Sequence, residues 1–311
     1  MVGKQDSGSD SECERQTNKR SRRTTSSTSD DQVYGKKSKS TGKYAYIKQQ
    51  TKALLIKYYC SPVSSIRDVR EFRNDTLLSD PKNKDYLQAA FDDFGKDLMD
   101  MSLRDIYNML NDHNPQFFLS MNYGTREESL EIIDNLIRHQ CNDDDEQVNV
   151  FLTAVVDILD KRIPKCNCLV VQSAPSAGKN YFFDMIFALV MNYGQLGTAN
   201  KHNLFAFQEA PNKRLIVWNE PNYESSVTDT LKMMTAGDPY TVRVKHAMDT
   251  HVRRTPVIVL TNKGVDFMYD QAFKDRIIKF TWQTAPFLKE VDFKPYPMAF
   301  FDLLNKYNIE Y

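Results

Sequence analysis

The sequence lacks the features of a secreted or membrane-spanning protein. No apolar run approaches the roughly 20 residues that a transmembrane helix needs, and the polar N-terminus does not resemble a secretory signal. The five cysteines form an odd, scattered set, and Cys166 and Cys168 stand too close together for the usual zinc-binding pair. We therefore expect an intracellular protein with reduced thiols and no membrane partner.

The chain also has no net charge, with 41 Lys/Arg and 41 Asp/Glu. The charges are unevenly distributed, because residues 1–48 carry eleven Lys/Arg against six Asp/Glu, and the remainder carries 30 against 35. Residues 1–43 have few large apolar side chains, so we expect a disordered basic tail. Its basic clusters at 18–23 and 36–43 are typical of nuclear-localisation signals or nucleic-acid-binding arms. A solvated tail with neither role is the alternative.

Hydrophobic periodicity divides the rest of the chain into two parts. Apolar residues at three- and four-residue spacing predict helices over 44–163. After residue 164, strands alternate with helices, which predicts a parallel sheet with helices on its faces. The predicted elements are a buried strand that opens at Cys168, strands at 203–208, 214–221, 256–262 and 276–282, helices at 181–193 and 225–237, and a β-hairpin with strands at 241–244 and 251–254.

Two polar features of the helical part have structural explanations. Thr125 is followed by Glu127 and Glu128, which places carboxylates in the first turn of a predicted helix, where they suit the helix dipole. The acidic run at 142–146 resembles a metal site, but a loop between two helices is the better interpretation. The helical part therefore offers no catalytic cluster.

Residues 168–180 have the order of a phosphate-binding loop. A short apolar run leads into a small-residue loop, then Gly178-Lys179, then an apolar helical pattern. A helix N-terminus presents free N–H groups to phosphate, and a lysine adds a point charge. A βα turn that uses Gly178 only for its backbone freedom is the alternative. The predicted ATP-binding residues are Ser173, Ala174, Pro175, Ser176, Ala177, Gly178, Lys179 and Asn180.

Polar residues mark the ends of the later strands. Glu220 lies at the carboxyl end of its strand, the end that faces the ligand crevice in open α/β sheets. A carboxylate there can hold Mg²⁺ or take the proton from an attacking water. Asn262 is placed to hydrogen-bond a γ-phosphate if its strand neighbours the phosphate-loop strand; otherwise it is an ordinary turn residue.

Two basic features follow the phosphate loop. Arg276 opens an apolar strand, and an arginine at this place is a candidate arginine finger for a neighbouring subunit, although position alone favours a surface arginine. Lys245 and His246 lie at the tip of the predicted hairpin. A protruding basic loop can grip the phosphates of a single strand, and a solvated hairpin is the alternative.

Taken in order, the segments 173–180, 214–221, 231–246, 255–262 and 274–280 resemble the superfamily 3 helicase domain of parvovirus and densovirus non-structural replication proteins. The bidensovirus branch looks most similar. The resemblance covers about residues 50–285. It implies an AAA+-like P-loop α/β domain with a central parallel sheet, preceded by an all-α segment and the disordered basic tail. The implied domains are a tail at 1–43, a helical oligomerisation segment at 44–163, an ATPase core at 164–285 and a C-terminal helical tail at 286–311.

The resemblance also implies an activity and roles for single residues. The activity is ATP-dependent unwinding of viral DNA, by a ring that is expected to be a hexamer moving on single-stranded DNA in the host nucleus, with viral replication proteins as further partners. The implied roles are phosphate binding for Lys179, Walker B acid for Glu220, sensor for Asn262, arginine finger for Arg276, DNA contact for Lys245 and His246, and Mg²⁺ ligation for Asn180 and Glu220.

This sequence departs from the family pattern at three points. Ser173 replaces the first glycine of the loop, and Asn180 replaces the hydroxyl residue, so an amide oxygen or a water must serve Mg²⁺. Glu220 is one acid where many relatives have two adjacent ones. It either serves both metal and water or is helped by Glu224.

Other functions stay open at this point. Vertebrate-virus relatives carry a nickase with a His-apolar-His pair and a nucleophilic Tyr, but no two of the five histidines here are two residues apart. We therefore expect no nickase domain. The rival functions are a P-loop kinase for a small molecule and a DNA-binding oligomer that holds ATP without hydrolysing it.

Overall fold

The computed structural model describes residues 37–113, 122–246 and 248–311. The chain divides into two units, 1–42 and 43–311. Of the first unit, residues 37–42 are described and form the start of helix α1 (Lys37–Tyr58). The helix thus begins before the predicted tail boundary at residue 43. The rest of the predicted tail, including the cluster at 18–23, lies outside the described residues.

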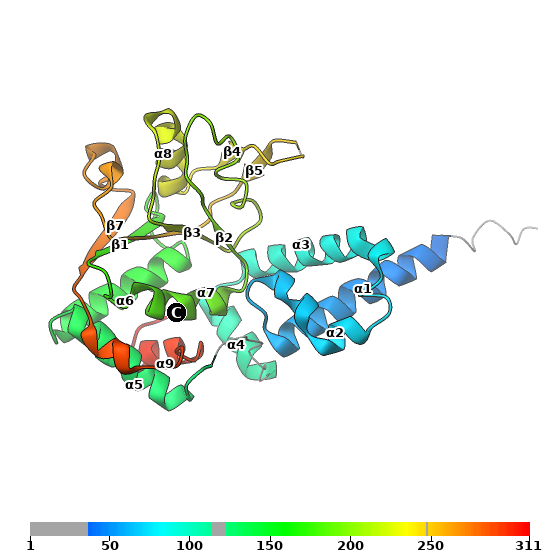
Figure 1. Ribbon diagram of the computed structural model, residues 1–311, viewed down its shortest axis with the longest axis horizontal. Helices are drawn as coiled ribbons and strands as arrows, with labels where there is room; N and C mark the ends of the chain where they lie inside the picture. The colour runs from blue at the N-terminus through cyan, green and yellow to red at the C-terminus, as the bar shows by residue number, and fades with distance from the viewer. Residues whose placement is uncertain (1–36, 114–121, 247) are drawn as a thin grey trace, which may run out of the picture. The chain divides into compact units, whose positions relative to one another are not determined.

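A five-stranded parallel sheet forms the centre of the second unit (Figure 1). Its order is β2-β3-β6-β1-β7, and every neighbouring pair is parallel. This confirms the predicted α/β fold with a central parallel sheet. The strands are β1 (Cys168–Ser173), β2 (Tyr193–Gln195), β3 (Leu215–Asn219), β6 (Val257–Thr261) and β7 (Ile277–Trp282).

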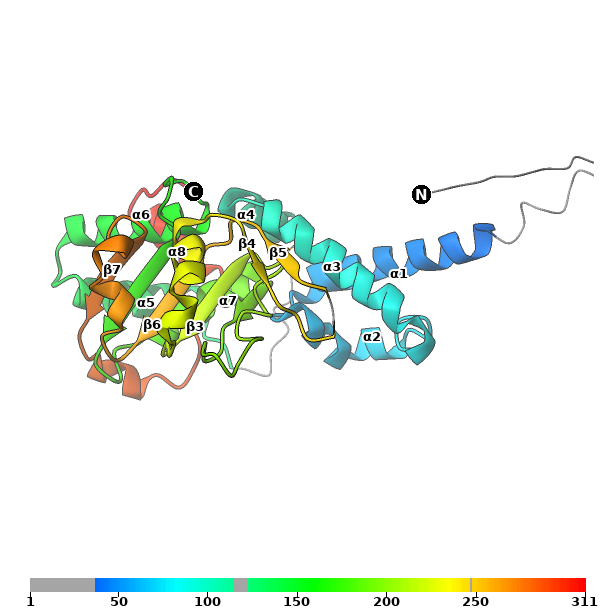
Figure 2. The ribbon, with the colours of Figure 1, turned by 90° about the horizontal axis from the view of Figure 1, so that it is seen from above.

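The two faces of the sheet are covered by different elements, because alternate side chains of a strand point to opposite faces. Leu169 and Val171 of β1 join the core that contains α6 (Asp145–Leu159) and α7 (Lys179–Val190). Cys168 and Val170 join the core that contains α8 (Thr228–Ala236) and the hairpin. Figure 1 shows these layers on the two sides of the sheet, and Figure 2 shows α8 lying over the strands.

The predicted helical segment is confirmed as helical and shares a hydrophobic core with the sheet. Thr125 and Glu128 form a capping box at the start of α5 (Arg126–Gln140), and Asp144 caps α6. Of the acidic run, residues 142–144 form the predicted loop between these helices, and residues 145–146 begin α6. Within the described part of the chain, no helix is long and apolar enough to cross a membrane. The other helices of this segment are α2 (Arg70–Asn74), α3 (Lys84–Asp100), α4 (Leu103–His113) and α5 (Arg126–Gln140), with 3₁₀ turns at Val63–Asp68 and Pro81–Asn83.

The last segment of the chain is packed into this core. Helix α9 (Ala299–Lys306) lies against α5, where Arg126 pairs with Asp302 and Lys306 Nζ lies 2.7 Å from Asp134 Oδ2. Its apolar residues are buried together with those of α5 and α6. Residues 286–311, predicted as a C-terminal helical tail, contain the 3₁₀ turn Pro286–Glu290 and α9, and the apolar residues of α9 are part of the core.

The prediction of a strand at 203–208 is wrong. This stretch forms successive turns, in which Ala206 N donates to Asn203 O and Gln208 N donates to Phe205 O. Asn200 Oδ1 accepts hydrogen bonds from the amides of His202 and Asn203. Such side-chain hydrogen bonds compete with strand pairing. The strand that pairs with β3 on this side of the sheet is β2.

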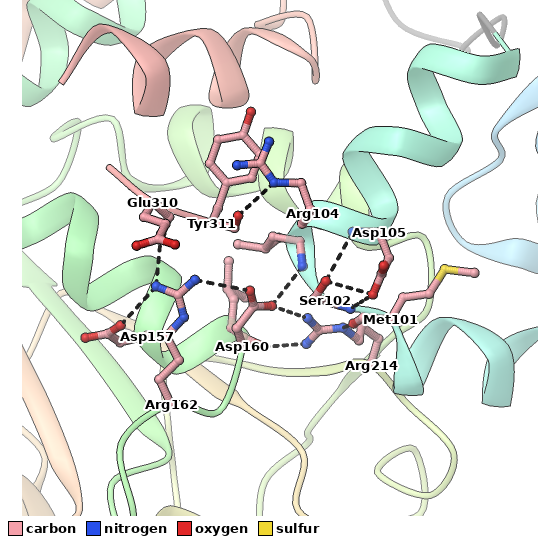
Figure 3. A network of polar contacts seen from close by, with 12 residues as sticks. Met101, Ser102, Arg104, Asp105, Asp157, Asp160, Arg162, Arg214, Glu310 and Tyr311 are labelled. Atoms are coloured by element: carbon pink, nitrogen blue, oxygen red, sulfur yellow. Dashed lines mark hydrogen bonds and ion pairs between the residues drawn. The ribbon is translucent and has the colours of Figure 1, made fainter. Parts of the chain in front are cut away.

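A buried arginine joins the helical segment to the sheet (Figure 3). Arg214 precedes β3 and is 1% exposed. Its guanidinium donates to Met101 O at 3.1 Å, to Leu159 O and to Asp160 Oδ1 at 3.0 Å. Asp160 Oδ1 also accepts from Leu103 N at 2.9 Å. The charge is thus paired and hydrogen-bonded, as a buried charge must be, and it fixes α4 and α6 at the amino end of β3.

Candidate nucleotide site

The phosphate-loop sequence folds as a tight turn between β1 and α7. Gly178 is the residue before α7 and has φ of 83°, a conformation that favours glycine. A Cβ at Gly178 would lie 2.6 Å from Leu288 Cδ1, so the space is also closed to a side chain. Within the described residues, no side chain caps the start of α7. Its first N–H groups and the positive end of its dipole are therefore free to bind an anion.

The outer side of this loop is held by two glutamines that the sequence did not reveal. Gln140, at the end of α5, donates to Ala177 O at 3.1 Å and to Gln283 O at 2.8 Å. Gln283 N donates back to Gln140 Oε1 at 2.7 Å, and Ala285 N donates to Ser176 O at 3.0 Å. Two of these bonds use loop carbonyls, those of Ala177 and Ser176. The conformation of the loop is thus fixed by α5 and by the residues after β7.

Lys179 is the first residue of α7 and is buried, with 9% of its surface exposed. Its Nζ donates to Asn262 Oδ1 at 2.8 Å. Burial lowers the pKa of Lys179, and the negative charge of Glu220 opposes this shift. Lys179 thus contacts the Asn262 amide and feels the negative charge of Glu220. A bound phosphate would stabilise the ammonium charge that burial disfavours.

Glu220 and Asn262 meet at the carboxyl edge of the sheet. Glu220 follows β3, has φ of 46°, and accepts from the backbone N–H of Asn262 at 2.9 Å to Oε1 and 3.1 Å to Oε2. The two residues follow adjacent strands, since β3 pairs with β6. The predicted neighbourhood of the Asn262 strand and the phosphate-loop strand is also found, because β6 pairs with β1.

These residues line one cavity of about 380 Å³. Its volume suits a ligand of nucleotide size, since ligand pockets usually measure about 300–1,000 Å³. Ser173 does not line it. Instead it ends β1 and its hydroxyl donates to Ala174 O at 2.7 Å. The lining comprises Ala174, Pro175, Ser176, Ala177, Gly178, Lys179, Asn180, Tyr181, Asn219, Glu220, Leu260 and Asn262.

The donor set of the cavity fits Mg²⁺ that arrives with a nucleotide. Mg²⁺ prefers oxygen ligands and is usually held by one or two carboxylates together with phosphates and water. Glu220 offers the carboxylate, and Asn180, which lines the same cavity, offers an amide oxygen. The described residues contain no group of three or more His, Cys, Asp or Glu that forms a dedicated metal site. Glu224 does not line the cavity; its Oε2 accepts from Lys201 N at 3.1 Å.

The basic residues predicted from sequence lie on other elements. Lys245 and His246 are exposed in the turn between β4 (Tyr240–Val242) and β5 (Thr250–Val252). These two strands pair antiparallel, which confirms the predicted hairpin. Arg276 immediately precedes β7 and is half-buried. Because β7 is parallel to β1, Arg276 lies at the amino edge of the sheet, roughly 20 Å along the strands from the phosphate loop.

Comparison with known proteins identifies the family to which this chain belongs. A family model for the parvovirus non-structural protein NS1 matches residues 82–284. The chain belongs to the parvovirus NS1 family. It is 59% identical to the initiator protein NS1 of Diatraea saccharalis densovirus and 60% identical to that of Junonia coenia densovirus, in each case over 100% of this chain and 59% of the relative. The chain therefore spans somewhat more than half the length of these curated relatives.

More distant NS1 proteins and solved structures extend the comparison. The initiator protein NS1 of Bombyx mori densovirus is 36% identical over 60% of this chain and 22% of the relative. Crystal structures of JCV helicase match with TM-scores of 0.54 and 0.50, at 12% and 15% identity; the first covers 84% of this chain and 85% of the helicase. This likeness shows the fold. The expected lack of a nickase stays a prediction, because the matched relatives extend beyond the length of this chain. The predicted closeness to the bidensovirus branch also stays a prediction.

Proposed function

We propose that this NS1 chain is an ATP-dependent DNA helicase of viral genome replication. The observation that carries the proposal is the convergence of Lys179, Glu220 and Asn262, from three separate segments, on one cavity at the carboxyl edge of the sheet. This edge is where α/β sheets bind their ligands. The fold shared with JCV helicase supports the same reading.

The proposed chemistry assigns one task to each residue. The first N–H groups of α7 and the Lys179 ammonium bind the β- and γ-phosphates of ATP. Glu220 orients the attacking water and accepts its proton, and the Asn262 N–H holds this carboxylate at 2.9 Å. Asn262 carries the amide that contacts the γ-phosphate. Glu220 and Asn180 would hold Mg²⁺, which would neutralise phosphate charge when bound.

Arg276 completes the site in a second copy of the chain. Its place at the amino edge of the sheet, away from the cavity of its own chain, supports action on a neighbour's γ-phosphate. Such a head-to-tail contact is heterologous, and heterologous contacts form a ring when the rotation between subunits closes. We therefore propose a homo-oligomeric ring, hexameric by resemblance, in which Lys245 and His246 contact single-stranded viral DNA.

Two further parts of the proposal rest on sequence. The basic clusters at 18–23 and 36–43 lead us to propose the host nucleus as the site of action, with the clusters serving as import signals or DNA-binding arms. Further viral replication proteins are proposed partners. Sizing of the chain with ATP and single-stranded DNA measures the number of subunits.

The direct test is ATP hydrolysis by the 311-residue chain with and without a single-stranded oligonucleotide. We expect hydrolysis that the oligonucleotide stimulates and that Lys179→Ala abolishes. Tight ATP binding without hydrolysis would instead support the oligomer that holds ATP as a structural ligand. ATP turnover that DNA does not stimulate and that requires a small-molecule phosphate acceptor would support the kinase.

A further inference from the structure

A buried asparagine lies where the hairpin meets the sheet. Asn167 immediately precedes β1 and is 0% exposed. Its Nδ2 donates to Met234 O at 3.1 Å and to Thr255 O at 2.6 Å, and its Oδ1 accepts from Arg254 Nε at 3.3 Å. A buried carboxamide with this many partners has few alternative arrangements, since each lost bond leaves a polar group unsatisfied.

The partners of this side chain belong to both ends of the hairpin. Met234 lies near the end of α8, which leads through Gly237 into β4. Arg254 and Thr255 follow β5 and lead into β6. One carboxamide therefore fastens the incoming and the outgoing strand of the hairpin to the amino end of β1.

Arg254 strengthens this attachment. Its Nη2 donates to Ile163 O and to Cys166 O, which lie just before Asn167. The same side chain covers Gly237, where φ is 77° and where an added Cβ would lie 2.8 Å from Arg254 Nε. The base of the hairpin is thus held by two neighbouring polar side chains, one of them fully buried.

The backbone of Asn167 reaches the arginine that is proposed to act in trans. Asn167 N lies 2.9 Å from Thr235 O and 3.2 Å from Arg276 O, and Asn167 O accepts from Val257 N at 2.9 Å. The residue that fastens the hairpin therefore also contacts the segment that carries Arg276.

We propose that Asn167 is the positioning residue that couples the Lys245-His246 hairpin to the Arg276 segment, with Arg254 as its support. In the proposed helicase, this coupling would connect bound DNA to the site of ATP hydrolysis in the next subunit. The effect of the coupling on activity therefore rests on the proposed function. The coupling itself is a property of the chain and is measurable without ATP or DNA.

Asn167→Leu removes the hydrogen bonds of the side chain and keeps its approximate volume. Asn192→Leu is a matched control, because Asn192 is 6% exposed and its Nδ2 also donates to two carbonyls, those of Gly95 and Asn212, away from the hairpin. We expect hydrogen exchange of Asn167→Leu to speed up at 238–256 and at 274–277 together. In Asn192→Leu, faster exchange should be confined to the surroundings of Asn192. Faster exchange at the hairpin alone, or equally in both variants, would overturn the coupling.

Activity provides the second readout. With a single-stranded oligo-dT as probe, Asn167→Leu should lower the ratio of stimulated to basal ATP hydrolysis by about fivefold or more. The same ratio should stay near wild type in Asn192→Leu. An unchanged ratio in Asn167→Leu would overturn the proposal. If the wild type shows no stimulation by DNA, the proposed function fails, and hydrogen exchange still decides the coupling.

Arg254→Met keeps the proposal testable if Asn167→Leu does not fold. The variant keeps the stem that covers Gly237 and loses the bonds to Asn167, Ile163 and Cys166. Arg253→Met is its control, because Arg253 contacts Met99 and Asp100 instead. We expect faster hydrogen exchange at 238–256 and at 274–277 together in Arg254→Met and not in Arg253→Met. The same change in Arg253→Met alone, or no difference between the two variants, would contradict the proposal.

Discussion

The two edges of the parallel sheet differ in how their polar residues are used. At the carboxyl edge, Lys179, Glu220 and Asn262 meet in one cavity. At the amino edge, Asn167 and Arg254 fasten the hairpin, and Arg276 lies beside them, on a part of the sheet that cannot reach the cavity of the same chain. Under the proposed function, a single chain carries two incomplete halves of the active site, one at each edge.

The largest expected effect is at the carboxyl edge. Lys179→Ala removes the buried charge that binds phosphate and should lower ATP hydrolysis on the order of 10³-fold, as the loss of a preorganised charge contact does. Steady-state hydrolysis measures it. Lys161→Ala is the matched control, because Lys161 is also a partly buried lysine with a lowered pKa but lies at the amino edge. Equal losses in both variants would remove the distinction between the edges.

A smaller loss is expected for Glu220→Gln. The amide keeps the shape of the side chain but cannot accept the proton of water, so hydrolysis should fall about 10²-fold or more while ATP binding is retained. Fluorescent-nucleotide binding and hydrolysis are measured side by side. Glu224→Gln should leave both near wild type, because Glu224 does not line the cavity. A larger loss for Glu224→Gln than for Glu220→Gln would reverse this assignment.

The hairpin should affect DNA binding more than basal hydrolysis. Lys245→Ala removes an exposed cation and should lower the slope of log affinity against log salt by about 0.7 per lost phosphate contact on single strands. Binding of an oligonucleotide at several salt concentrations measures this slope. Lys82→Ala removes an exposed lysine in the 3₁₀ turn Pro81–Asn83 and should leave the slope unchanged. The same slope for Lys245→Ala and wild type would contradict a DNA contact at the hairpin.

The smallest effect concerns the pH dependence of stability at the amino edge. Burial and the nearby Arg214 lower the pKa of Lys161 to about 8, from 10.5. The unfolded chain therefore holds this proton to higher pH, and the contribution of Lys161 to stability rises between about pH 8 and 10.5. Melting of wild type and Lys161→Met at pH 7.5 and 9.5 should show wild type gaining relative to the variant. A difference that does not change with pH would contradict the lowered pKa.

The sequence predicted the carboxyl edge well, because parallel strands bring their ends together. Once 168–173, 214–221 and 256–262 are recognised as buried strands, their polar end residues Glu220 and Asn262 must lie near the phosphate loop. The hairpin was predicted from two short strands around a polar turn. The start of α5 was predicted from Thr125 followed by the carboxylates of Glu127 and Glu128.

The amino edge and the outer wall of the loop were not predicted, because their contacts join residues far apart in the chain. Asn167 and Arg254 are 87 positions apart, and Gln140 and Gln283 are 143 apart. No local pattern marks a buried amide whose partners are backbone carbonyls of other segments. The wrong strand at 203–208 has a local cause, since apolar residues suggested a strand while Asn200 and Asn203 stabilised turns.

The central claim is that one active site takes Lys179 from one chain and Arg276 from the next. Mixing Lys179→Ala with Arg276→Ala subunits tests it, because each variant alone lacks one half of every site. Random assembly of equal amounts pairs an intact loop with an intact finger at about a quarter of the interfaces. We predict that the mixture hydrolyses ATP well above either variant alone. A mixture no more active than the variants, under conditions where mixed oligomers are shown to form, would contradict the claim.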